Sequence, residues 1–236
     1  MRMPPEIVAR PDPLALAREA ADQFVALARS AIDTQGRFTV VLSGGSTPRL
    51  LYEQLITQPV EWQSVHVFWG DERCVPPDHP DSNFGLAQRV LLSRIDIPAQ
   101  NVHRLKGEFD PAQAALQYED ELRVVFGALP RFDLILLGMG SDGHTASLFP
   151  HTPALHEQQR WVVAQYVEKL QADRLTLTPP VLNHAATVIF LITGSDKAAA
   201  LQSVWHGPSD PRRFPAQIIM PTTGRVIWLV DQAALA

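Results

Sequence analysis

The sequence predicts an open, doubly wound α/β fold in which a mainly parallel sheet is covered by helices on both faces. Short runs rich in Val, Ile, Leu and Phe recur along the chain, and most are followed by a loop and then by a helical pattern. The runs are mostly apolar instead of alternating regularly, which is typical of parallel strands buried on both faces. Right-handed crossovers between such strands place the intervening helices on the two faces of one open sheet.

The composition fits one continuous domain over residues 1–236. Hydrophobic residues make up 46% of the chain and charged residues 19%, so wholesale disorder is excluded. The net charge of −5 is spread along the chain without a basic block, and we therefore expect no nucleic-acid partner. The longest apolar runs, residues 134–137 and 185–192, are far shorter than the ~18 residues of a membrane helix, so we expect no membrane contact. The single cysteine, Cys74, excludes an internal disulfide and favours a cytoplasmic setting.

The first helix is expected over residues 12–33. Asp12 suits the N-cap position with Pro13 at the first helical position, and Gly36 follows the expected end. Apolar residues at helical spacing give this helix one buried face: Leu16, Ala20, Phe24, Leu27 and Ala31.

Strands are expected at several later runs. They are residues 38–42, 65–69, 132–137, 188–193 and 226–230, with shorter candidates at 161–164 and 175–178. Three further helices are expected: one after the strand at 38–42, one that begins at about residue 82, and one that begins at about residue 195. Because ligands of open parallel sheets bind outside the carboxyl ends of the strands, unusual polar residues should follow strands. They do so at four places.

The first of these loops reads Ser43-Gly44-Gly45-Ser46-Thr47-Pro48. Its two glycines allow the backbone to approach a ligand closely, and Thr47 is expected to be an N-cap with Pro48 as the first helical residue. Free backbone N–H groups at a helix N-terminus form an anion site, so we expect residues 43–47 to bind substrate. The alternative is a tight strand-to-helix turn. A P-loop is excluded because the Gly-Lys-Ser/Thr ending is absent.

The second loop, Gly70-Asp71-Glu72-Arg73, follows the strand at 65–69. Two adjacent carboxylates and an arginine are costly to bury without partners. A carboxylate here would transfer a proton, and Arg73 would bind an anion or a developing negative charge. The alternative is an ordinary solvated turn. Cys74 is expected to be an inert thiol, because no partner histidine can be assigned to it.

The third loop reads Gly138-Met139-Gly140-Ser141-Asp142-Gly143-His144. Its formal G-x-G-x-x-G raises the hypothesis of a dinucleotide site. Pro150 follows too soon for the long helix of that motif, and no acidic residue closes a second strand about 20 residues later. We interpret His144 as a general base on a constrained loop, with Asp142 orienting either the histidine or a substrate hydroxyl. The alternative is a structural histidine.

The fourth loop, Gly194-Ser195-Asp196-Lys197, precedes an expected helix. If Ser195 is the N-cap, Lys197 lies in the first turn, where a cation opposes the helix dipole. A bound anion would explain that placement, and Arg174 could join it. The two cations together suggest a phosphate. The remaining histidines have no metal-ligand spacing, so we expect no metal.

The loops together resemble 6-phosphogluconolactonase, in the glucosamine-6-phosphate isomerase/6-phosphogluconolactonase family. The resemblance covers these segments, in chain order: Ser43–Pro48, Trp69–Arg73, Asp81–Asn83, Gly138–Pro150, Arg174–Thr178 and Gly194–Ala198. The block ending in Ser147-Leu148-Phe149-Pro150 is the most specific. The resemblance implies a Rossmann-like fold of the deaminase and ribose-phosphate-isomerase type. It also implies hydrolysis of 6-phospho-D-glucono-1,5-lactone, a phosphorylated sugar lactone, without a cofactor.

Combined with the loops, the resemblance implies roles for individual residues. The phosphate would be held by the backbone of residues 44–47 with Arg174 and Lys197. His144 would accept a proton from the attacking water, with Asp142 orienting the site. The remaining expected substrate contacts are Ser43, Asp71, Arg73 and Gly143. Arg73 is the candidate for stabilising the tetrahedral oxyanion, with a phosphate contact as the alternative. The sequence does not determine the oligomeric state.

Two other functions are the alternatives. Glucosamine-6-phosphate deaminase shares the fold, but its Asp-Gly-His is followed by Ile-Ala-Phe-Asn-Glu-Pro, and residues 145–150 lack that glutamate. Its Asp-Glu is followed by Tyr where this chain has Arg73. A non-catalytic sugar-phosphate sensor would carry an extra DNA-binding module, for which the chain has neither the room nor the charge. The missing glutamate and Arg73 argue against the deaminase, and the missing module argues against the sensor, so the lactonase is favoured.

Overall fold

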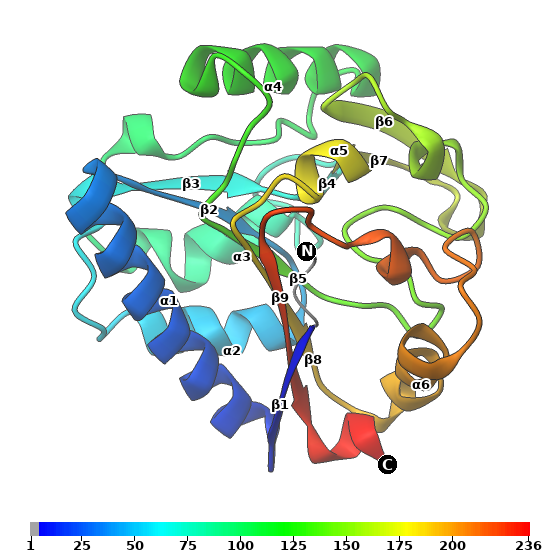
Figure 1. Cartoon of the computed structure of the whole chain (residues 1–236). Helices are drawn as coiled ribbons and strands as arrows, with labels where there is room; N and C mark the ends of the chain where they lie inside the picture. Colours follow the sequence, from blue (N-terminus) through cyan, green and yellow to red (C-terminus); the bar gives the residue numbers. More distant parts are fainter. Residues whose placement is uncertain (1–4) are drawn as a thin grey trace.

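The computed structural model describes residues 5–236 and contains two sheets (Figure 1). The larger sheet has six parallel strands in the order β1-β9-β8-β5-β2-β3. These strands are β1 (Glu6–Arg10), β2 (Phe38–Leu42), β3 (Val65–Trp69), β5 (Leu134–Leu137), β8 (Thr187–Ile192) and β9 (Arg225–Asp231). Every residue of β2, β5 and β8 is buried, as expected for strands covered on both faces. The predicted mainly parallel α/β fold is confirmed.

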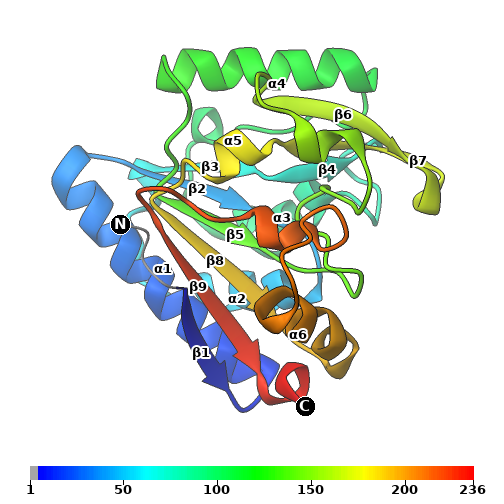
Figure 2. The same cartoon turned by 45° about the vertical axis from the view of Figure 1, so that its right-hand side comes forward.

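The helices are α1 (Pro13–Gln35), α2 (Ser46–Leu55), α3 (Asn83–Val90), α4 (Pro111–Phe126), α5 (Pro179–Leu182) and α6 (Ala198–His206). In both views, α1 and α2 lie on one side of the large sheet and α4 lies on the other (Figures 1 and 2). The predicted caps of α1 are confirmed: the Asp12 carboxylate accepts a 2.8 Å hydrogen bond from the Ala15 N–H, and Gly36 ends the helix with φ 75°. No helix among residues 5–236 is long and apolar enough to cross a membrane.

The strand order reverses in the middle of the large sheet. From β2 the chain runs outward to the neighbouring β3, whereas β5 lies on the other side of β2 and leads to β8 and β9. The loops that follow β2 and β5 therefore lie side by side at the carboxyl ends of their strands. A crevice at such a switch point is where ligands of this architecture bind.

A second sheet is antiparallel and has three strands in the order β4-β7-β6. Its strands are β4 (Asp71–Arg73), β6 (Val162–Val167) and β7 (Ala172–Leu177). Gly70 joins the two sheets, because its N–H donates to the Leu42 carbonyl at 3.1 Å and its carbonyl accepts from the Leu177 N–H at 2.8 Å. The strand candidates at 161–164 and 175–178 thus belong to a separate sheet. The carboxylate-rich loop at 71–73 is a strand.

Apart from β4, one strand and two helices were not predicted: β1, α4 and α5. The edge strand β1 has no buried residue, so it forms no buried apolar run. Helix α4 does carry local signals, since Asp110 caps its N-terminus and Gly127 ends it with φ 70°.

Two expected N-caps are wrong. The cap position of α2 is taken by Gly45, whose φ of 112° turns the chain early, so that Thr47 lies inside the helix. Ser195 opens a short 3-10 turn that ends at Lys197, and α6 begins only at Ala198. The glycine at 194, with φ 96°, makes the turn that Ser195 was expected to cap.

Candidate active site

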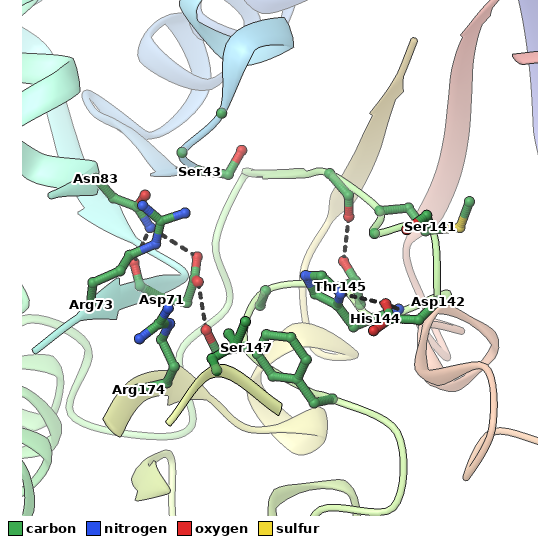
Figure 3. Close-up of a pocket in the computed structure, with 18 of the residues that line it drawn as sticks. Ser43, Asp71, Arg73, Asn83, Ser141, Asp142, His144, Thr145, Ser147 and Arg174 are labelled. Carbon is green, nitrogen blue, oxygen red and sulfur yellow. Dashed lines mark hydrogen bonds and ion pairs between the residues drawn. The ribbon is translucent and has the colours of Figure 1, made fainter. Parts of the chain in front are cut away.

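A cavity of about 470 Å³ lies at the switch point (Figure 3). Of the predicted site residues, the following line it: Ser43, Gly44, Gly45, Asp71, Arg73, Asp142, His144, Arg174 and Lys197. The other three, Ser46, Thr47 and Gly143, are not part of the lining. The cavity is also lined by residues that the sequence did not single out as a site, including Asn83, Ser147, Phe149 and Lys169.

His144 and Asp142 form a fixed pair on the loop after β5. Asp142 Oδ1 lies 2.6 Å from Nδ1 of the imidazole and accepts a 3.2 Å hydrogen bond from the backbone N–H of His144. The bond to the imidazole is the main reason that the pKa of Asp142 lies well below its usual range. Phe149 stacks on the other side of the histidine, with ring centroids 4.2 Å apart. The imidazole is therefore held from two directions.

One glycine of this loop, Gly140, makes room for that pair. A Cβ on Gly140 would lie 2.1 Å from His144 Nδ1 and 2.7 Å from Asp142 Oδ1. Gly143 has φ 77° and is buried against Phe214, and its N–H donates to the Gly140 carbonyl at 2.9 Å. Gly143 thus shapes the loop, and its expected contact with substrate stays a prediction.

The loop after β2 packs against α3. A Cβ on Gly44 would lie 1.8 Å from Asn83 Oδ1, so only glycine fits there. The N–H and carbonyl of Ser43 both hydrogen-bond to the Tyr52 hydroxyl. Thr47 bonds through its hydroxyl to Thr193, at 2.6 Å, which turns it away from the lining. Among the described residues, no side chain caps the N-terminus of α2.

The adjacent carboxylates of β4 point in opposite directions because successive strand residues face opposite sides. Asp71 is 8% exposed, and its carboxylate accepts hydrogen bonds from Ser147 Oγ at 2.7 Å and Asn83 Nδ2 at 3.2 Å. It lies on the cavity side (Figure 3).

Glu72 is 2% exposed and faces the N-terminus of α3. Its carboxylate accepts from the backbone N–H groups of Asn83, at 2.7 Å, and Phe84, at 2.8 Å, and from the Ser82 hydroxyl. Burial raises its pKa, and these hydrogen bonds oppose the increase. Glu72 therefore holds α3 in place and, unlike Asp71, is not part of the cavity lining.

Three cations that were predicted to bind an anion reach the cavity from separate elements. Arg73 and Arg174 are directly opposite each other in the β4–β7 register. Burial, and then the neighbouring Arg73, lower the pKa of Arg174. Lys197 is one-quarter exposed at the start of α6 and lies 3.0 Å from Asp196. Two adjacent guanidinium groups favour an anion that bridges them.

The lining residues that were not predicted differ in how far the sequence alone could have identified them. Asn83 and Ser147 stand in segments that carry the family resemblance, but their side chains act through long-range contacts with Asp71. Lys169 has no local signal, because its Nζ reaches Asp142 Oδ2, at 2.8 Å, from the tip of the β6–β7 hairpin. Within residues 5–236, no three His, Cys, Asp or Glu side chains are grouped so as to hold a metal ion.

Comparisons with known proteins agree with this geometry. Residues 11–228 match the family described as Glucosamine-6-phosphate isomerases/6-phosphogluconolactonase. A 6-phosphogluconolactonase from Nostoc sp. is 44% identical over 95% of this chain and 94% of its own length. Another, from Synechocystis sp., is 48% identical over 86% of each chain. The crystal structure of 6-phosphogluconolactonase from Thermotoga maritima has a TM-score of 0.86 at 30% identity, covering 97% of this chain and 100% of that one.

Proposed function

Because the chain belongs to the glucosamine-6-phosphate isomerase/6-phosphogluconolactonase family, we propose that it hydrolyses 6-phospho-D-glucono-1,5-lactone to 6-phospho-D-gluconate, in the oxidative pentose phosphate pathway. The observation that carries this proposal is the paired His144 and Asp142 in a cavity that also contains Arg73, Arg174 and Lys197. A base and several cations in one cavity suit a substrate that has both an ester carbonyl and an anionic phosphate.

The pair defines how the imidazole would act. An ionised Asp142 only accepts hydrogen bonds, so Nδ1 of His144 carries the proton and Nε2 is the basic nitrogen. Nε2 takes a proton from water as the water oxygen attacks C1 of the lactone. The imidazolium then returns a proton to the ring oxygen as the C1–O bond breaks. One histidine thus serves both steps, and no cofactor is consumed.

The cations supply the second half of the proposal. Arg174 and Lys197, with the backbone of Gly44 and Gly45 just before α2, bind the phosphate. Arg73 lies opposite Arg174 in register and on the far side of the cavity from His144 (Figure 3). That placement favours the phosphate over the oxyanion as the partner of Arg73. Asp71 and Ser43 are left to contact the sugar.

Glucosamine-6-phosphate deamination is the competing activity, because it shares the family and the Asp-Gly-His element. The segment 145–150 of this chain has no glutamate, and Phe149 stacks on His144 instead. The test measures both reactions with the purified protein: acid release from freshly prepared 6-phosphogluconolactone, corrected for spontaneous hydrolysis, and ammonia release from glucosamine 6-phosphate. Lactone hydrolysis well above background with no ammonia supports the proposal. The reverse result refutes it.

A further inference from the structure

The carboxylate of Asp142 is shared between two partners that come from different sheets. Its Oδ1 faces His144, and its Oδ2 lies 2.8 Å from Nζ of Lys169. Asp142 follows β5 of the large sheet, whereas Lys169 lies between β6 and β7 of the small sheet. The lysine is 67% exposed along its side chain, but its charged end meets a carboxylate that is only 23% exposed. A surface side chain therefore completes the environment of a half-buried pair.

The turn that carries Lys169 is held in a defined conformation. Residues Glu168–Leu170 form one 3-10 turn, and Gln171 closes it in the left-handed region, with φ 48°. The Gln171 N–H and side-chain amide both donate to the Glu168 carbonyl, at 3.1 and 2.7 Å, and the Tyr166 hydroxyl donates to the Gln171 side chain at 3.1 Å. The hairpin thus places the ammonium group by its backbone.

We propose that Lys169 is a positioning residue for the lactone hydrolysis, acting on His144 through Asp142. This inference rests on the proposed function. The ion pair restrains the carboxylate from rotating away from Nδ1, and the ammonium group offsets part of the carboxylate's negative charge, which would otherwise favour protonation of the imidazole. The first effect keeps the imidazole correctly oriented, and the second keeps more of it neutral at a given pH.

The other charged groups around the cavity do not replace this contact. Asp71, Arg73 and Arg174 lie on β4 and β7, and Lys197 lies at the start of α6. They contribute a background field at the imidazole, and Phe149, which stacks on the ring, contributes no charge. The effect of Lys169 should accordingly depend on Asp142.

The experiment compares Lys169→Met, Lys169→Arg and the control Glu168→Gln, which removes a charge from the same turn without touching Asp142. kcat and KM are measured from about pH 5 to 8 at constant ionic strength, a range that spans histidine titration. For Lys169→Met we expect kcat to fall by about 2- to 5-fold, the range of an exposed ion pair. KM should stay within about twofold, and the acid limb of the kcat profile should move up by about half a pH unit. Lys169→Arg should restore kcat and the position of the acid limb, and Glu168→Gln should leave kcat and the acid limb unchanged.

Two further measurements separate positioning from other roles. In an Asp142→Asn background, Lys169→Met should have no additional effect on the pH profile. NMR titration of the His144 imidazole, identified by its loss in His144→Asn, should show the same upward movement in Lys169→Met without substrate. Because this titration needs no turnover, it tests the coupling even if the lactone is not the substrate.

Three results would overturn the inference. A raised KM with an unmoved acid limb would mean that Lys169 binds the phosphate directly. A lowered melting temperature with unaltered kinetics and an unaltered titration would mean that the ion pair only stabilises the hairpin. Equal effects of Lys169→Met with and without Asp142 would mean that the lysine does not act through the carboxylate.

Discussion

Gly140 and His144 approach so closely that a single added carbon on Gly140 would lie 2.1 Å from Nδ1 of the imidazole. The same carbon would lie 2.7 Å from Asp142 Oδ1. The loop therefore accommodates the His144–Asp142 hydrogen bond only because residue 140 has no side chain. Gly138, two residues earlier, has no heavy atom within 4 Å of an added Cβ.

The first prediction concerns this contact. Gly140→Ala should force the imidazole away from Asp142 and lower kcat by at least ~10²-fold, the size of a lost general base. Gly138→Ala adds the same methyl group in open space, so its loss of kcat should be at least ~10-fold smaller. Steady-state kinetics and thermal melts on both variants check this. If both lose kcat equally while remaining folded, the clash at position 140 does not determine activity.

The second prediction concerns the base itself. His144→Asn should fold normally, bind 6-phosphogluconate about as well as the unchanged protein, and lose at least ~10²-fold in kcat. The acid limb of the pH–rate profile should disappear in this variant. His156→Asn, an exposed histidine outside the cavity lining, is the matched control. Initial rates must be corrected for spontaneous lactone hydrolysis.

One result of this experiment would contradict the assignment of His144 as the base. If His144→Asn keeps kcat within about threefold of the unchanged protein, proton abstraction does not depend on the histidine. The base would then be sought in Asp142 or Asp71, both of which line the cavity.

The third prediction concerns phosphate recognition. A charge-assisted contact is worth ~1.5–3 kcal/mol, so two such contacts should favour the phosphorylated lactone over gluconolactone by at least ~10²-fold in kcat/KM. Lys197→Met should mainly raise KM, because a remote phosphate contact binds ground state and transition state alike. Lys106→Met, which changes an exposed lysine that is not part of the cavity lining, is the control. Similar efficiency on the two lactones would refute the phosphate site.

The fourth prediction concerns stability against pH. The pKa of Asp142 is lowered in the folded protein, first by the hydrogen bond with His144 and also by Lys169. Its ionised form is therefore favoured by folding, and that stabilisation is present above the unfolded-state pKa of about 4 and lost as the pH falls through the lower folded value. Urea unfolding of the unchanged protein and of Asp142→Asn should show a difference at pH 6 that shrinks below pH 4. A difference that grows toward acid pH would contradict the sign of this shift.

The elements that sequence patterns predicted are those governed by local chemistry. The strands β2, β3 and β8 follow from short runs of mostly apolar residues, and α1 follows from its cap residues. Strand β1 was missed because its stability comes from pairing with β9, more than 200 residues away along the chain. The second sheet was misread because β4 is three polar residues long and gains its strand conformation from β7.

The site divides in the same way. His144 and Asp142 could be identified because both lie on one glycine-framed loop, and their partnership is local. The opposite roles of Asp71 and Glu72 could not be separated, because they depend on which face of a strand meets Ser147 and which meets α3. Lys169 could not be found, since its partner is 27 residues away and belongs to another sheet.

Gly70 connects β3 to β4, and the number of residues in this connection determines which side chains line the cavity. Asp71 and Arg73 face the cavity and Glu72 faces α3 because strand residues alternate, so the spacing from Trp69 decides which side chains enter. Inserting one residue beside Gly70 would exchange these faces: the buried glutamate would enter the cavity, and both lining residues would turn toward α3. The number of residues between the two sheets is thus set by the geometry of the fold, because it decides which side chains of β4 face the cavity.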